Sequence, residues 1–192
     1  MGVCLAYCRV SPRNALCLLE HPILIHRFLG RDEADLPPAG GFWKSIFGGR
    51  RAVPEGVPSL EPRPDDDDGD TDKAWNAIHY ILTGSAQGGE FPAGFILHGG
   101  RPVGTEEAGY GPARLFDTGE AAEIAKALRA CDHATFYSRF DGAAMDQAKV
   151  YPQIWSRSRE ESTQYVWESL NELRYFVEGV VESRQWLMLY FT

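Results

Sequence analysis

Trp186-Leu-Met-Leu-Tyr-Phe191 is a run of six apolar and aromatic residues. A strand without alternation of apolar and polar residues is typical of a sheet that is covered on both faces. The residues before it predict the longest helix of the chain, which is expected to begin at a capping box of Ser158 and Glu161 and to reach about Ser183. Its apolar positions step by four and three, and they are Val166, Leu170, Leu173, Val177 and Val180. A covered strand next to an amphipathic helix indicates helices packed on a sheet.

The N-terminal part of the chain predicts a second strand and a broken helix. Residues 3–10 are mostly apolar and aromatic, and we expect this strand to neighbour the one described above in the sheet. Ser11 and Pro12 have the pattern of an N-cap followed by the first helical residue. Pro22 is expected to divide the helix into two short pieces, because proline removes a backbone donor and clashes with the preceding turn.

The middle of the chain predicts shorter elements. Asp72 is expected to cap a helix over residues 73–82, and Asp117 with Glu120 has the spacing of a capping box for another helix. The remaining predictions are two short strands and one further helical stretch, over 95–97, 113–116 and 133–148. This order of elements suits an α+β fold, with a small mixed β-sheet and several helices in a single domain over residues 1–192.

Residues 31–71 differ in composition from the rest of the chain. Together with Gly30 they hold six of the twelve prolines and seven of the twenty glycines, and they include the run Asp65-Asp66-Asp67-Asp68. We therefore expect an insertion or linker within the domain. Phe42 and Trp43 lie there between two pairs of glycines, and they favour either a short helical turn that docks on the domain or a partner-binding motif.

The formal net charge of −8 comes mostly from this region. Residues 31–72 hold eleven acidic and five basic residues, whereas the rest of the chain holds sixteen and fourteen. A negative chain repels phosphates, so we expect no nucleic-acid partner. The acidic region is interpreted first as a solvated linker and second as a segment that binds a protein partner.

Other sequence features predict the compartment. No apolar stretch approaches the length that crosses a bilayer, and the first residues lack the regions of a signal peptide. The four cysteines, Cys4, Cys8, Cys17 and Cys131, do not form the two paired clusters of a zinc site, and the histidines lack metal-ligand spacing. We expect a cytoplasmic chain with reduced cysteines, no membrane partner, no metal and no cofactor.

Several motifs together resemble a known family. The most specific is Asp72-Lys-Ala-Trp-Asn-Ala-Ile-His-Tyr-Ile-Leu-Thr-Gly84. The others are Met1-Gly2 before a strand, Gly99-Gly100, Gly109-Tyr-Gly-Pro-Ala-Arg114 and Tyr151-Pro-Gln-Ile-Trp155. The pattern resembles the YfbM-like family, catalogued as domain of unknown function 1877, and covers nearly the whole chain outside residues 31–70. The resemblance implies a bacterial, cytoplasmic, single-domain α+β protein, and it brings no established activity.

The candidate binding residues come from a helix, a glycine-rich loop with the strand after it, and a proline turn, which are predicted to border one cleft. They are Trp75, His79, Tyr110, Arg114, Tyr151 and Trp155. Each also has a structural interpretation. His79 is then a satisfied histidine on a helix face, and Arg114 forms an ion pair with Glu106 or Glu107. The two aromatic residues of the turn then plug the core.

Two hypotheses about function follow. The first is a non-catalytic binding or interaction domain with a protein partner, including an immunity-like version in which negative charge steers association with a basic toxin. The alternative is a small-molecule enzyme such as a hydrolase, with His79 as the base and Arg114 as the anchor for an anion. The first is favoured because no set of catalytic residues is complete.

Overall fold

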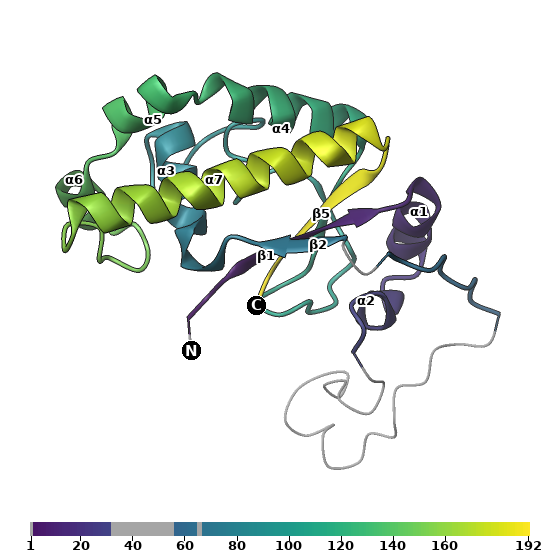
Figure 1. The fold of residues 1–192 in the computed structure, drawn as a ribbon. Helices are drawn as coiled ribbons and strands as arrows, with labels where there is room; N and C mark the ends of the chain where they lie inside the picture. Colours follow the sequence, from purple (N-terminus) through teal and green to yellow (C-terminus); the bar gives the residue numbers. More distant parts are fainter. Residues whose placement is uncertain (1, 32–55, 65–66) are drawn as a thin grey trace, which may run out of the picture.

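The computed structural model describes residues 2–31, 56–64 and 67–192, which form one α+β domain (Figure 1). The strands, in sequence order, are β1 (Leu5–Val10), β2 (Asp68–Asp70), β3 (Arg101–Pro102), β4 (Arg114–Phe116) and β5 (Trp186–Phe191). The α-helices are α1 (Pro12–Glu20), α2 (Leu24–Phe28), α3 (Trp75–Thr83), α4 (Thr118–Ala130), α5 (His133–Arg139), α6 (Gly142–Gln147) and α7 (Arg159–Glu182). The α+β class is confirmed, and none of the helices in the described residues has the length and apolar character needed to cross a membrane.

The five strands have the order β2-β1-β5-β4-β3. Each neighbouring pair in the described residues is antiparallel, so the predicted mixed sheet is wrong in this respect. β1 and β5 pair along their full length, from Leu5 opposite Phe191 to Val10 opposite Trp186. The prediction that these two strands are neighbours is confirmed, and they form the centre of the sheet.

Both faces of the sheet are apolar, as the absence of alternation in β5 predicts. On β1, Leu5 and Tyr7 face one hydrophobic cluster, whereas Cys8 and Val10 face the other. Successive side chains of β5 divide between the same two clusters. Because successive side chains of a strand point to opposite faces, two apolar faces require an apolar residue at every position.

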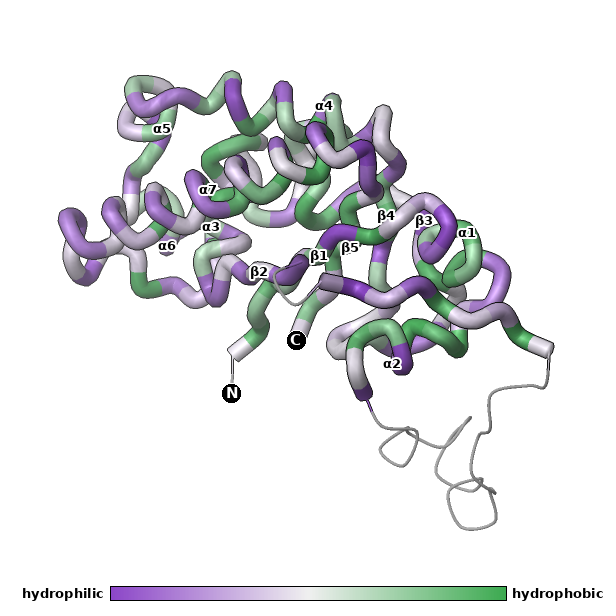
Figure 2. The backbone as a smooth tube through the Cα atoms, turned by 45° about the vertical axis from the view of Figure 1, so that its right-hand side comes forward, coloured by the Kyte–Doolittle hydropathy of each residue, from purple (hydrophilic) through white to green (hydrophobic). Residues whose placement is uncertain are grey.

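The larger cluster lies between the sheet and helices α3, α4 and α7. All five stripe residues of α7 are fully buried in it, which confirms the predicted core-facing stripe. In Figure 1, α7 crosses the domain with α4 alongside and α3 behind it. In Figure 2, the hydrophobic colour of the helices gathers on their inner sides.

The smaller cluster lies on the other face, under α1 and α2. The division of the N-terminal helix near Pro22 is confirmed, since α1 ends at Glu20 and α2 begins at Leu24. Ser11 accepts a hydrogen bond from the backbone N–H of Asn14 and so caps α1 as predicted. Residues 57–64 run over this layer, and Val57 and Leu60 pack against its buried side chains.

Two local predictions are wrong. Asp72 does not cap a helix: it lies at a positive φ of 44° in a 3₁₀ turn before α3, and its carboxylate accepts hydrogen bonds from Cys4 and Tyr165 instead. Residues 95–97 are not a strand, because the backbone folds into turns in which Leu97 and His98 both donate to the carbonyl of Gly94.

Of the two predicted capping boxes, one is confirmed and one is wrong. The capping box of Asp117 and Glu120 at the start of α4 is confirmed, with both reciprocal hydrogen bonds present. The one predicted at Ser158 is wrong, because that side chain makes no capping bond to α7. The stretch 133–148 is two helices rather than one, because Asp132 caps α5 and Asp141 caps α6.

The predicted linker over 31–71 is wrong at its C-terminal end. There β2 pairs with β1, and Asp67 is buried and lies 3.6 Å from the guanidinium of Arg9. Half of the acidic run is therefore part of the fold, since Asp68 begins β2. Residues 32–55 and 65–66, with the Phe42-Trp43 motif, lie outside the described residues.

Candidate functional site

His79 lies on α3 and is fully buried. Its Nε2 lies 2.8 Å from the carbonyl oxygen of Gly88, so Nε2 carries the proton and donates it. Its Nδ1 is buried and has no partner among the described residues. Burial lowers the pKa of His79, and the nearby His98 and Arg114 lower it further. The imidazole is therefore a neutral group inside the protein.

Arg114 fixes the turns that replace the predicted strand at 95–97. Its guanidinium donates to the carbonyl oxygens of Phe95 and Gly99, each at 3.1 Å, and to that of Ile96. Burial lowers the pKa of Arg114 to about 10, which leaves it charged at neutral pH. The predicted ion pair with Glu106 or Glu107 is wrong: Arg114 is held by backbone carbonyls, and Glu106 lies 3.5 Å from His26.

Trp75 and Tyr151 fasten the two terminal strands. Their rings stack with centroids 5.7 Å apart, and the Trp75 ring meets Phe191 edge-on at 5.0 Å. The Trp75 indole donates to the carbonyl of Val3, whose N–H donates to the Tyr151 hydroxyl. Tyr110 joins the same strand end through its backbone N–H, which donates to the carbonyl of Phe191.

Trp155 lies apart from both the turns at 95–97 and the ends of the terminal strands. It is 1% exposed, and its indole donates to the carbonyl of Val150. The six predicted residues therefore do not border one cleft: His79 and Arg114 hold turns, while Trp75, Tyr151 and the backbone of Tyr110 hold the chain ends. Trp155 is the one of the six that lines a hollow described below.

Two adjoining hollows lie between α5, α6 and the first turns of α7, with volumes of about 470 and 450 Å³. They share three residues, Tyr137, Phe140 and Arg159, and we call them together the α5–α7 groove. The other lining residues are Glu160, Thr163 and Gln164 in one hollow, and Ser138, Asp141, Gly142, Ala143, Trp155 and Ser156 in the other. Each volume is in the range of pockets that bind ligands.

The local sequence explains how the groove is shaped. α5 ends at Arg139 with Phe140 as its C-cap, and Asp141 then begins α6 by accepting the N–H of Ala144. Gly142 lets the loop pass closely, because a Cβ there would lie 2.3 Å from the carbonyl oxygen of Trp155. Asp146 then holds the backbone N–H groups of Trp155 and the next residue, each at 3.0 Å.

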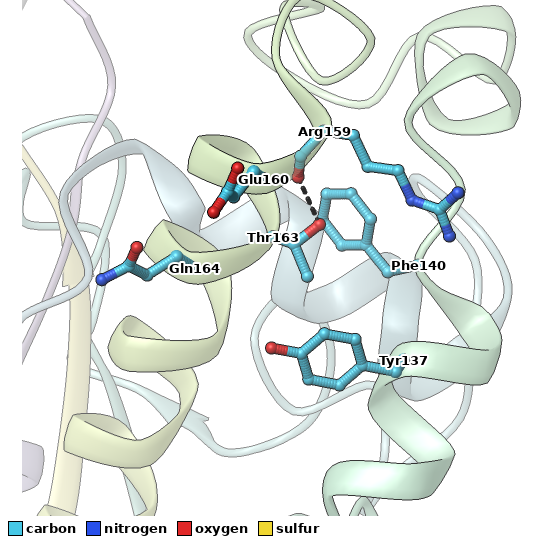
Figure 3. Close-up of a pocket in the computed structure, with 6 residues that line it drawn as sticks. All are labelled: Tyr137, Phe140, Arg159, Glu160, Thr163 and Gln164. Carbon is cyan, nitrogen blue, oxygen red and sulfur yellow. Dashed lines mark hydrogen bonds between the residues drawn. The ribbon is translucent and has the colours of Figure 1, made fainter.

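The groove combines aromatic surface with the side chain of an arginine. Tyr137 is 44% exposed, and its hydroxyl points toward α7, while the side chain of Arg159 extends past Phe140 (Figure 3). The Arg159 guanidinium makes no hydrogen bond or ion pair with any residue that the structure describes. The rings of His133 and Trp167 continue the aromatic surface, at 4.2 and 6.2 Å from that of Tyr137.

Sequence reasoning missed Tyr137, Phe140 and Arg159. The available signal was the pair Asp132 and Asp141, nine residues apart, which are the caps of two helices rather than features of one. Within the described ranges, no group of three or more acidic, histidine or cysteine side chains could hold a metal ion.

Comparisons with known proteins agree with the fold. The crystal structure of a protein of unknown function, YfbM from Escherichia coli, superposes with a TM-score of 0.64 at 14% sequence identity and covers 98% of this chain and 99% of that one. No curated protein matches the chain. The family model described as "Domain of unknown function (DUF1877)" matches residues 1–190. The predicted resemblance is thus confirmed, and the chain belongs to the DUF1877 family.

Proposed function

We propose that this chain is a non-catalytic binding domain for a protein partner, and that the α5–α7 groove receives a segment of that partner. The observation that carries the proposal is the set of three residues shared by both hollows: an exposed tyrosine, a buried phenylalanine and an arginine without an acidic partner in the described residues. Tyrosine and arginine are among the residue types that most often dominate the binding energy of protein interfaces.

The charges around the groove favour a carboxylate next to an apolar side chain in the partner segment. Asp141 is occupied as the cap of α6, and Glu160 lies in the first turn of α7, where the helix dipole stabilises it. Arg159 forms no ion pair with any residue in the described part of the chain, and its planar guanidinium suits a carboxylate through two parallel hydrogen bonds. The Tyr137 ring then offers the apolar side chain a surface that is already in place.

The immunity-like version of this proposal identifies the partner as a basic toxin. It is supported by the net charge of −8, because opposite charges accelerate association. Expression of the captured partner alone should then arrest bacterial growth, and co-expression of this chain should restore it. A partner that does not impair growth would contradict the immunity version and leave the groove proposal intact.

The alternative of a small-molecule hydrolase with His79 as the base receives no support from the described contacts. A general base must reach the proton that it removes. His79 is fully buried, and its Nε2 is held by Gly88.

Photo-crosslinking in cells tests the groove. Tyr137→p-benzoylphenylalanine places a reactive ketone at the shared wall of the hollows, and irradiation should give one covalent adduct with a protein partner. Arg159→Glu in the same chain should abolish the adduct, because it reverses the charge that meets the partner carboxylate.

Tyr175 provides the matched control. It is 79% exposed on the same helix as Arg159 and lines neither hollow. Tyr175→p-benzoylphenylalanine should not give this adduct. The same adduct from both positions, or an adduct that survives Arg159→Glu, would overturn the proposal.

A further inference from the structure

Residues 57–64, which we call the strap, cross the outer side of α1 and α2 on the opposite face of the sheet from the α5–α7 groove. The strap has no helix or strand of its own. Its backbone is held instead by one side chain: Asn14 Oδ1 accepts the N–H of Glu61 at 2.8 Å, and Asn14 Nδ2 donates to the Glu61 carbonyl at 3.1 Å. Asn14 is 2% exposed, so both bonds form away from water.

A side chain that pairs with both backbone groups of one residue recognises an extended peptide in the way that a neighbouring strand would. Binding of this kind gives affinity without regard to the ligand's side chains. Specificity must come from side-chain contacts at the paired residue and on either side of it, and the strap makes three such contacts.

The three contacts involve different chemistry. Leu60 packs against the smaller hydrophobic cluster. The carboxylate of Glu61 accepts a hydrogen bond from the hydroxyl of Ser11 and lies 3.4 Å from the guanidinium of Arg13. Arg63 donates to the carbonyl of Phe28 and lies 4.4 Å from the centre of its ring. The surface of α1 and α2 thus contacts a leucine, the acidic residue that follows it and, two residues later, an arginine.

The prolines of the strap suit a ligand that binds in an extended form. Pro58 and Pro64 flank the recognised residues and Pro62 lies between two of them, and each proline fixes φ and has no N–H to satisfy. Segments of this type lose little conformational entropy when they bind. They are recognised by grooves in other proteins for the same reason.

The strap does not fill its site. A hollow of about 560 Å³ remains between it and the end of α2, lined on one side by Arg27, Phe28 and Leu29. The core clusters beneath the sheet faces consist of buried side chains, whereas Glu61 and Arg63 stay partly exposed. The contact between the strap and the helices resembles a peptide interface more than a core.

We propose that α1 and α2 form a second binding site, for an extended, proline-flanked segment of a partner protein with the pattern Leu-Glu-x-Arg, and that the strap is its internal occupant. A partner segment binds when the strap leaves, so the two compete for Asn14. This site is separate from the α5–α7 groove and shares no residue with it.

A synthetic peptide of residues 56–64, labelled with fluorescein, serves as the probe. The receptor is the full chain with Leu60→Asp and Arg63→Glu. These substitutions weaken the binding of its own strap and leave the residues of α1 and α2 unchanged. Fluorescence anisotropy should show binding to this receptor and binding at least about ten-fold weaker to the unaltered chain, because an occupied site lowers apparent affinity in proportion to its open fraction. Adding Asn14→Ala to the receptor should abolish binding, and a peptide of scrambled sequence should not bind.

A second measurement tests the proposal without the altered receptor, in case that variant does not fold. In the unaltered chain, an excess of unlabelled peptide should shift the backbone NMR signal of Glu61 in the strap, because the peptide displaces it from Asn14, while the side-chain amide signals of Asn171 on α7 stay in place. No binding to a folded receptor, no shift of the Glu61 signal of the strap, or equal binding of the scrambled peptide would overturn the proposal. Dimers of the unaltered chain that form by exchange of the strap would also overturn it, because the occupant would then be a second copy of the chain.

Discussion

The two faces of the sheet are covered by different kinds of structure. On one face, the 24-residue α7 and the 13-residue α4 pack along β1 and β5 and bury a continuous apolar stripe. On the other face, two short helices and the strap cover the same strands, and single side chains such as Asn14 hold the pieces together. The first face is stabilised by the larger apolar cluster, whereas the second combines a smaller apolar cluster with polar contacts that hold the strap in place.

This difference predicts where substitutions cost most. Leu170→Ala should lower the free energy of unfolding by about 2–5 kcal/mol, because it opens a cavity in the fully buried stripe. Leu60→Ala in the partly buried strap should cost about 1 kcal/mol, in line with the smaller area that it removes. Urea denaturation followed by circular dichroism measures both. Equal losses in the free energy of unfolding at the two sites would show that the two faces do not differ in this way.

Substitutions of Arg114 are expected to cause the next largest loss of stability. Arg114→Met should cost about 3 kcal/mol, because three turn carbonyls lose their buried donor. Arg114→Lys should recover only part of this, since a single ammonium cannot reproduce the fork of donors. The control is Arg157→Met, which removes an exposed arginine outside these turns and should leave stability nearly unchanged.

The two predicted capping boxes give a matched pair of smaller effects. Asp117→Ala should cost about 1 kcal/mol, because it removes the acceptor for two backbone N–H groups at the start of α4. Ser158→Ala should change stability by less than about 0.5 kcal/mol, because Ser158 makes no capping bond. Thermal denaturation of the two variants tests the pair. A cost at Ser158 as large as that at Asp117 would mean that this side chain does cap α7 in solution.

The smallest expected effect is on the dependence of stability on pH. Burial holds the pKa of His79 below its ordinary value, so the unfolded chain binds a proton here more readily than the folded chain does. Stability should therefore fall as the pH drops from about 6.5 toward the lower folded pKa, and His79→Gln should reduce that fall. Unfolding in urea at pH 7.5, 6.5 and 5.5 gives the comparison. His133→Gln is the control, because His133 is exposed, and a change of the same size there would argue against this assignment.

The sequence predicted the elements that follow a simple rule. The stripe of α7 and the uninterrupted apolar run of β5 each repeat one physical pattern over six or more residues, and both are confirmed. Pro22 and Asp117 act within one turn of the chain, so their effects were also predictable. The terminal strands were predicted as neighbours, although the antiparallel direction of the whole sheet was not.

The predictions that fail depend on contacts between distant residues. Residues 95–97 have the composition of a strand, but Arg114 binds their carbonyls and holds them in turns. Asp72 has a good side chain for a cap, yet Cys4 and Tyr165 bind its carboxylate from other parts of the chain. The α5–α7 groove was missed for the same reason, because Tyr137 and Arg159 meet only after α5 and α7 pack together.

The pairing of the first and last strands has a practical consequence for protein engineering. Cys4 and Thr192 exchange both backbone hydrogen bonds, so the two ends of the chain leave the domain side by side (Figure 1). Domains with adjacent ends tolerate insertion into a loop of a host protein, because the host loop need not stretch to accept them. This domain can therefore be inserted as one unit between two residues of a reporter protein, with the α5–α7 groove still open to solvent.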